Sequence, residues 1–216
     1  MKEACAMKKL FHIVATPRDE ESRTLQVSRS FLEAFTENNH DWTVDELRLF
    51  GERLPPLTAQ RTAGKYALLG GRDLPADLQE QWQDIHNHIN RFLSADAYLI
   101  STPMWNFTVP YVLKQYIDVI VQPRYLFQYT EGVPEGLVKD RKMVVITSRG
   151  GEYTDKGMKL LDIQEPYLRT VFGFVGITDV TFIHAQPMDA AGPEVRRERL
   201  LHARERARNT AATFSR

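Results

Sequence analysis

The chain has 216 residues, of which 43% are hydrophobic and 26% are charged, an ordinary composition for a globular protein. Its 28 basic residues equal its 28 acidic residues in number, so the charge balance gives no support for nucleic acid as a partner. No stretch approaches the run of about 20 apolar residues that a membrane-spanning helix needs, and the single Cys5 excludes an internal disulfide and a cysteine-held metal or iron–sulfur site.

The N-terminus lacks the apolar core of a signal peptide, which predicts a cytoplasmic protein. Residues 1–6 precede the first apolar run, and Met1 and Met7 are equally good starts. We therefore expect a flexible extension over 1–6 and a single domain over 7–216.

Strand and helix patterns then alternate along the chain. Short apolar runs predict buried parallel strands, and one alternating run predicts an edge strand. The strands are expected at 10–15, 42–49 (the edge strand), 97–102, 142–147 and 179–184, and the helices at about 22–36, 59–69, 75–93, 110–121, 160–172 and 193–214. This alternation predicts an α/β fold: a doubly wound five-stranded parallel sheet of order 2-1-3-4-5 with helices on both faces.

The loop after the first strand carries the hydroxyls of Thr16, Ser22 and Thr24 before a predicted helix. Hydroxyls and amides at a helix N-terminus suit a phosphate monoester, although Ser22 could equally serve as a simple helix cap. The acidic residues 19–21 oppose a phosphate, and Arg18 and Arg23 offset part of their charge.

Residues 103–107, Pro-Met-Trp-Asn-Phe, follow the central strand directly. A loop at the carboxyl end of a central parallel strand is where open α/β sheets bind ligands. Apolar and aromatic side chains around one asparagine suit a flat ring with a polar edge, which favours a flavin.

A third loop follows the fourth strand, where Gly150 and Gly151 allow the backbone to approach a flat ligand closely. The chain has no Gly-x-Gly-x-x-Gly after its first strand and no Gly-Lys-Ser/Thr loop, so glycine-loop dinucleotide binding and P-loop chemistry lose support. A hydroxyl-rich first loop is instead the flavodoxin manner of holding a phosphate.

Four stretches, in order and at matching separations, resemble the FMN-dependent NADH azoreductase family of flavodoxin-like quinone reductases. They lie at 103–107, at 129–131 with 134–137, at 146–151, and at 167–168 leading into 173–179, and the resemblance covers nearly the whole chain from Met7. It implies a flavodoxin-like FMN-binding domain and a homodimer. The chain differs from the family in having Thr16 where serine is common and Trp105 where tyrosine is common.

The resemblance also implies which residues bind the cofactor and the substrate. The cofactor-binding residues would be Thr16, Ser22, Arg23 and Thr24 at the phosphate, Pro103, Met104, Trp105, Asn106 and Phe107 along the isoalloxazine, and Ser148, Arg149, Gly150 and Gly151 at its pyrimidine side. The substrate pocket would be shaped by Phe127, Tyr129 and Phe174, some donated by the partner subunit.

The implied activity is ping-pong two-electron transfer from NADH or NADPH through FMN to quinones or azo compounds. FMN carries the chemistry, so no catalytic residue of the protein is assigned. A non-enzymatic flavodoxin-type electron carrier and a flavin-binding regulatory protein are the alternatives. Carriers are usually acidic, whereas this chain has a formal net charge of zero, which favours the enzyme.

The remaining features have simpler interpretations. His86 and His88 lie two apart on a predicted helix and face different directions, so no metal site is predicted. His12 and His184 lie in predicted strands and are expected to be packing residues. The arginine-rich last helix is expected to be a solvated face. On the helix after the aromatic loop, Tyr111, Tyr116 and Ile120 suit either the core or a dimer interface, and the resemblance favours the interface.

Overall fold

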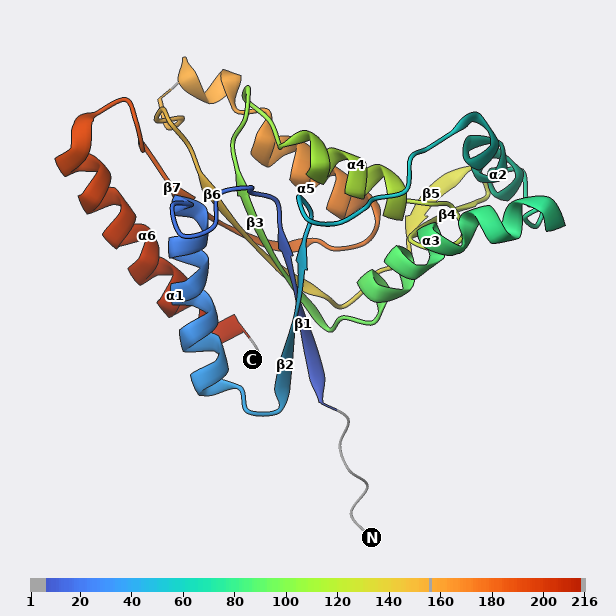
Figure 1. Cartoon of the computed structure of the whole chain (residues 1–216), viewed down its shortest axis with the longest axis horizontal. Coiled ribbons are helices and arrows are strands. Elements are labelled where there is room, and N and C mark those ends of the chain that lie inside the picture. The colour runs from blue at the N-terminus through green and yellow to red at the C-terminus, as the bar shows by residue number, and fades with distance from the viewer. Residues whose placement is uncertain (1–6, 156, 215–216) are drawn as a thin grey trace, which may run out of the picture.

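The computed structural model describes residues 7–155 and 157–214, so the flexible extension predicted for residues 1–6 lies outside it. Five strands form one parallel sheet in the order β2-β1-β3-β6-β7 (Figure 1). These strands are β1 (Lys8–Val14), β2 (Trp42–Arg48), β3 (Ala97–Pro103), β6 (Lys142–Ser148) and β7 (Asp179–Ala185). The predicted order 2-1-3-4-5 describes the same topology, so the flavodoxin-like sheet is confirmed.

Helices cover both faces of the sheet. The helices α1 (Arg23–Asn38) and α6 (Gly192–Phe214) lie together on one face, whereas α3 (Ala76–Leu93), α4 (Tyr111–Ile120) and α5 (Gln164–Phe174) lie on the other (Figure 1). The short helix α2 (Ala59–Leu69) packs on the outer side of α3. Each face has its own apolar core, because the central strands are buried on both sides. Among the described residues no helix is long and apolar enough to cross a membrane.

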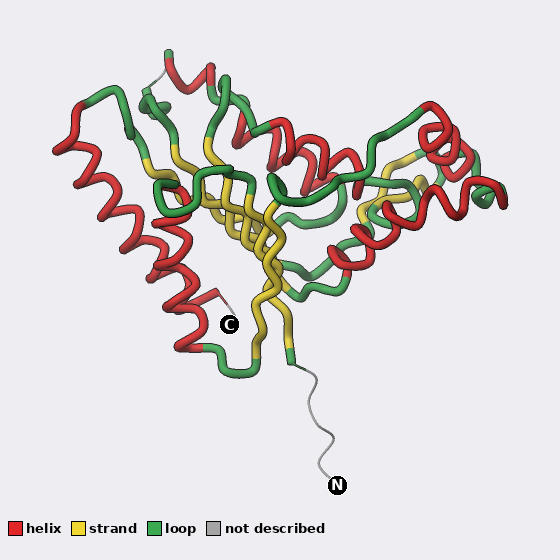
Figure 2. The backbone as a smooth tube through the Cα atoms, in the orientation of Figure 1, coloured by secondary structure: helices red, strands yellow, loops and turns green. Residues whose placement is uncertain are grey.

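The connection after α4 contains structure that the sequence did not predict. It forms an antiparallel hairpin of β4 (Phe127–Thr130) and β5 (Val133–Gly136), which is separate from the main sheet (Figure 2). The short 3-10 helix η1 (Met158–Leu161) precedes α5, so α5 begins later than predicted. Both are short segments with little periodicity to detect.

The interface predicted on α4 is wrong for two of its three residues. Tyr116 and Ile120 are buried in the core against α3, and only Tyr111 is exposed. The face of a helix that packs on its own sheet is as apolar as an interface would be, so the sequence pattern could not separate them.

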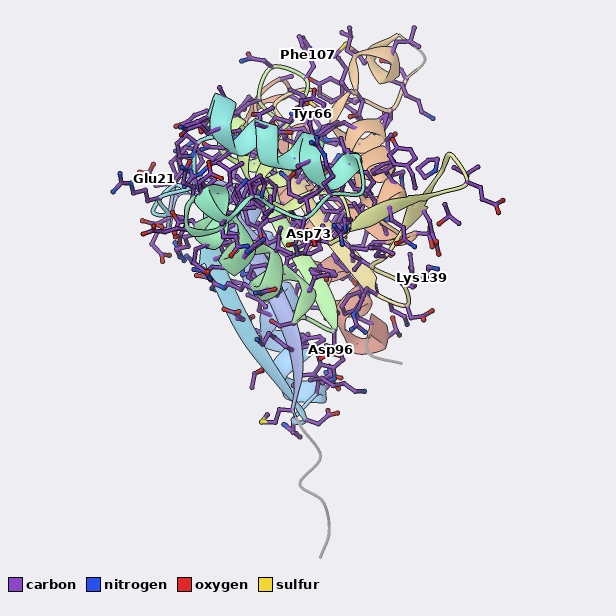
Figure 3. The ribbon with its side chains drawn as sticks, turned by 90° about the vertical axis from the view of Figure 1, so that its right-hand side faces the viewer. Glu21, Tyr66, Asp73, Asp96, Phe107 and Lys139 are labelled. Atoms are coloured by element: carbon purple, nitrogen blue, oxygen red, sulfur yellow. The ribbon has the colours of Figure 1, made fainter. Side chains whose placement is uncertain are left out.

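The carboxyl ends of all five parallel strands meet at one edge of the sheet. This edge holds the three loops singled out by the sequence, after β1, β3 and β6. Phe107 lies near this end of the molecule, and Asp96 lies toward the opposite one (Figure 3).

Candidate functional site

A cavity of about 240 Å³ opens at the carboxyl edge of the sheet. Its walls come from the loop after β1, the start of α1, and the ends of β3, β6 and β7. The lining residues are Thr16, Pro17, Arg18, Ser22, Arg23, Thr24, Pro103, Met104, Trp105, Ser148, Arg149, Gly150, Met188 and Asp189. The three predicted loops therefore form one site, as expected for strands that end at a common edge.

The start of α1 supplies polar groups to this cavity. Ser22 is the N-cap, and its Oγ accepts a hydrogen bond from the amide of Leu25 at 3.3 Å, so the capping role considered for it is real. The amides of Arg23 and Thr24 come before the first full turn and lack partners within the helix. Thr24 Oγ1 lies 2.7 Å from Ser148 Oγ, which joins the first loop to the end of β6. The result is a compact set of hydroxyls and amides at a helix N-terminus, suited to an anion.

The acidic residues 19–21 are each paired with an arginine. Asp19 meets Arg48 at 2.6 Å, Glu20 meets Arg29 at 2.6 Å, and Glu21 meets Arg18 at 2.8 Å. The hydrogen bond from Arg18 lowers the pKa of Glu21. These ion pairs neutralise the run, so its repulsion of an anion is much weaker than the sequence indicates.

The aromatic loop ends in a tight turn. Trp105 and Thr108 exchange both backbone hydrogen bonds, at 2.9 and 3.0 Å, around Asn106 and Phe107. Both turn residues have positive φ, 47° and 68°, which a bulky residue such as Phe107 adopts only under tertiary constraint. That constraint is visible, because the carbonyl of Phe107 accepts a hydrogen bond from the amide of Ile163 at 3.1 Å.

The Trp105 ring, at the base of this turn, belongs to an aromatic cluster. It lies 5.7 Å from the ring of Phe50, which in turn lies 5.8 Å from that of Tyr111. The indole is therefore held in place by Phe50, which follows β2. A fixed, half-buried aromatic wall suits a planar ligand.

Arg149 contributes to the site differently from the prediction. Its side chain is 1% exposed, and its Nη1 donates to Asp162 at 2.7 Å while its Nε donates to Gln164 at 3.3 Å. Burial lowers the pKa of its guanidinium. Gln164 also donates to the carbonyl of Pro103 at 2.9 Å. The guanidinium is thus engaged by the start of α5, and it ties the β6 loop to the aromatic loop.

Three predicted residues, Asn106, Phe107 and Gly151, lie beside the cavity in sequence but do not line it. Met188 and Asp189 line it and were not predicted. They follow β7, whose carboxyl end meets the same edge, so the topology alone could have indicated them. Asp189 accepts a 2.6 Å bond from Arg23, which therefore has a protein partner inside the predicted phosphate site.

The three predicted substrate-pocket aromatics lie together away from this cavity. The ring of Phe127 is 4.7 Å from that of Phe174 and 6.0 Å from that of Tyr129. They join the β4–β5 hairpin to the end of α5, and none lines the cavity.

A larger cavity, about 850 Å³, lies between α3 and the segment that joins β2 to α2. Two partly buried arginines that line it already have partners: Arg61 faces Asp84 at 3.5 Å and Arg91 binds Asp45 at 2.7 Å. The smaller cavity at the strand ends is therefore the better candidate site.

The histidines are not bare packing residues. His86 bonds Tyr125 at 2.8 Å and His88 packs edge-on against Tyr116, so the two face different directions as predicted. The expectation that His12 and His184 merely pack is wrong, because both ring nitrogens of each have hydrogen-bond partners.

The chain is similar in sequence and in structure to several known proteins. Residues 8–211 match the model of a family described as having a flavodoxin-like fold. The chain is 34% identical to an FMN-dependent NADH:quinone oxidoreductase of Nitratidesulfovibrio vulgaris strain DP4 over 96% of this chain and 100% of that protein. It is 37% identical to FMN-dependent NADH:quinone oxidoreductase 1 of Trichormus variabilis over 95% and 97% of the two chains. An FMN-dependent NADH-azoreductase from Bacillus anthracis, solved in complex with FMN, superposes with a TM-score of 0.86 at 29% identity, covering 97% and 100% of the chains.

Proposed function

The chain belongs to the flavodoxin-like FMN-dependent NADH:quinone oxidoreductases and azoreductases, and from this premise we propose that it is an FMN-dependent enzyme that transfers two electrons from NADH to quinones or azo compounds. The single observation that carries the proposal for this chain is the cavity where its three predicted loops converge. The comparisons favour this enzyme over an electron carrier, because relatives that match nearly their full length are named as oxidoreductases.

The residues of the cavity fit FMN. Thr16, Ser22 and Thr24, with the first amides of α1, offer hydrogen bonds to a phosphate at a helix N-terminus. Such charge-assisted bonds contribute about 1.5–3 kcal/mol each. Met104 and Trp105 offer an apolar wall to a planar ring, and Gly150 offers a backbone that a flat ligand can approach closely.

When bound, FMN supplies the hydride and electron transfer between the two substrates. The part of this protein is to bind and to orient. The phosphate residues anchor one end of the cofactor, and the turn at Asn106 and Phe107 presents its main chain and one amide side chain beside the other. No nucleophile or proton-transfer triad is assigned to the protein.

A homodimer would complete the site. The cavity of about 240 Å³ is smaller than the roughly 300–1,000 Å³ of a typical ligand site, so this chain alone covers only part of a cofactor and substrate. Exposed apolar side chains lie on segments near it in the chain, in the turn after Trp105, at the start of α4 and just before α5: Phe107, Tyr111, Leu160, Leu161 and Ile163. The amide of Ile163 donates to the carbonyl of Phe107, so the first and last of these segments are in contact. Large exposed apolar side chains on segments that contact one another favour an interface.

In such a dimer, Phe127, Tyr129 and Phe174 of the partner would serve the substrate pocket. Sedimentation of the wild type and of Leu160→Asp tests this arrangement, because Leu160 is 83% exposed in the single chain. We expect a dimer for the wild type and a monomer for the variant. A wild-type monomer that binds FMN and turns over would contradict the arrangement. The cytoplasmic location stays a prediction.

The activity is tested by anaerobic mixing of the FMN-loaded protein with NADH, followed by a benzoquinone. Bleaching of the visible flavin band by NADH and its stoichiometric recovery on adding the quinone would support the proposal. Binding of FMN without reduction by NADH would favour the electron carrier. Failure to bind FMN at all would refute the assignment of the cavity.

A further inference from the structure

A chain of buried polar side chains crosses the sheet below the cavity. His12 of β1 is 1% exposed, and its Nδ1 lies 3.0 Å from Glu46 on β2. Its Nε2 lies 2.7 Å from Ser101 Oγ on β3, which lies 2.6 Å from Ser28 Oγ on α1. Ser28 donates to the carbonyl of Thr24 at 2.9 Å. These five residues, here called the His12 relay, link a surface carboxylate to the first turn of α1.

The number of protons in the relay fixes the state of His12. A serine hydroxyl has one proton. If Ser28 donates to the Thr24 carbonyl, then Ser101 must donate to Ser28, and His12 Nε2 must donate to Ser101. The Glu46 carboxylate can only accept, so Nδ1 must donate as well. All four hydrogen bonds exist together only when His12 is an imidazolium.

Loss of one proton from His12 reverses the direction in which the two serine hydroxyls donate their hydrogen bonds. Ser101 then donates to Nε2 and Ser28 donates to Ser101. The Thr24 carbonyl loses its side-chain donor, because the proton of Ser28 now serves Ser101. The relay therefore has two arrangements, and only the protonated one keeps the side-chain hydrogen bond from Ser28 to the Thr24 carbonyl.

The second histidine–glutamate pair has no such requirement. Thr147 can donate to His184 Nδ1, 3.0 Å away, and His184 Nε2 can donate to Glu165 at 2.7 Å. A neutral imidazole satisfies both bonds. His184 is thus a matched control for His12.

The charged groups around the relay lie in ion pairs or hydrogen bonds. Glu46 is the carboxylate in contact with the ring, and its hydrogen bond from His12 lowers its pKa to about 2. Arg48, on β2, bonds the other oxygen of Glu46 at 2.7 Å and also meets Asp19. On the helices packed over this side of the sheet, Arg29 of α1 binds Glu20 and Arg204 of α6 binds Ser30, so these charges are engaged with other groups.

The far end of the relay lies at the candidate site. Thr24 lines the cavity, and its hydroxyl lies 2.7 Å from that of Ser148 at the end of β6. The hydrogen bond from Ser28 to the Thr24 carbonyl therefore stabilises the turn whose amides and hydroxyls would face a bound anion.

We propose that His12 is a positioning residue that, as an imidazolium, fixes the first turn of α1 through Ser101 and Ser28 for binding the phosphate of FMN. The inference rests on the proposed function. FMN affinity falls when His12 loses a proton. The expected loss is about fivefold, the equivalent of one hydrogen bond of about 1 kcal/mol.

The test combines two measurements on the full-length chain from about pH 6 to about pH 9, a range that spans the ordinary titration of histidine. Imidazole ¹⁵N NMR reports how many nitrogens of His12 carry protons, with or without FMN. Quenching of flavin fluorescence gives the dissociation constant of FMN. The second ionisation of a phosphate, near pH 6, affects every variant alike, so ratios to the wild type isolate the relay.

Ser28→Ala removes the last link and leaves His12 in place. Ser101→Ala is a second variant should the first fail to fold, and His184→Gln is the control. We expect two protonated nitrogens on His12 at neutral pH and a fivefold loss of affinity that follows its deprotonation. Ser28→Ala should bind FMN weakly throughout and lack that step, and His184→Gln should retain it.

Two results would overturn the inference: a singly protonated His12 at neutral pH, or the same pH step in the wild type and in Ser28→Ala. Absence of FMN binding at every pH would instead refute the proposed function. The NMR measurement on the FMN-free chain would still decide the protonation of His12.

Discussion

Replacing Asp162 by asparagine should destabilise the protein by about 3–5 kcal/mol, the usual cost of removing one partner from a buried ion pair. Asp162 is 11% exposed and lies 2.7 Å from the Arg149 guanidinium, which is 1% exposed. The guanidinium stays charged even though burial lowers its pKa. Its Nη2 already has no hydrogen-bond partner among the described residues, so it has no second acceptor to turn to.

Urea unfolding and thermal unfolding measure this loss. For a chain of this size each kcal/mol shifts the melting temperature by about 2–4 °C, so Asp162→Asn should melt roughly 6–20 °C below the wild type. Glu21→Gln is the control, because the Arg18–Glu21 pair is well exposed and solvent screening leaves such a pair with little effect on stability.

The same reasoning predicts a rescue. Arg149→Met combined with Asp162→Leu removes both charges and should recover most of the lost stability. If Asp162→Asn loses no more stability than Glu21→Gln, or if the double variant is less stable than Asp162→Asn, the ion pair does not stabilise the fold in this way.

Three further predictions concern single positions. Gly136→Ala should lower the free energy of unfolding by about 1–3 kcal/mol, because a Cβ there collides with the backbone just after α5. Gly173→Ala lies within α5 beside open space and should raise the free energy of unfolding by up to about 1 kcal/mol. Urea unfolding distinguishes the loss from the gain. Asn106→Gly keeps the positive φ and removes the amide, so it should purify with less FMN at an unchanged melting temperature; equal flavin content would refute a role for the amide. The hydrogen bond from His184 lowers the pKa of Glu165 from 4.5 to about 2, so Glu165 stabilises the fold above about pH 4.5 and this stability disappears as the pH falls through about 2. Glu165→Gln should flatten that part of the stability profile, and an unchanged acid limb would contradict the pairing.

The elements with strong patterns were predictable, and the weak ones were not. The predicted helix at 59–69 matches α2, and the predicted strands at 97–102 and 142–147 are each one residue short of β3 and β6. Their periodicity or continuous apolar character is unambiguous. The β4–β5 hairpin has strands of four residues with Pro134 and Gly136 inside, which sequence patterns read as loop.

The residues that line the candidate site were predictable from the order of the strands. The ion pairs around the site were not, because they depend on side chains that meet only in the folded chain. Strand ends place Thr16, Trp105 and Ser148 at one edge whatever their side chains do. The charge of the loop after β1 could not be judged the same way. Its acids looked unfavourable because their partners, Arg48 on β2 and Arg29 in the second turn of α1, become neighbours only in the folded chain.

The partners of His12 in the His12 relay become visible only when the arrangement of the neighbouring strands is known. His12 is paired with Glu46 across β1 and β2, 34 residues apart, and reaches Ser101, 89 residues away, on the other neighbouring strand. Within an apolar strand a lone histidine looks like a packing residue, yet a buried polar group needs partners. The useful signal was the coincidence of two polar residues, His12 and Ser101, inside two largely apolar strand sequences. The order 2-1-3 makes those strands neighbours, and the register places Ser101 two residues along from the position opposite His12, on the same face of the sheet. The serine on the covering helix meets the same need for a partner.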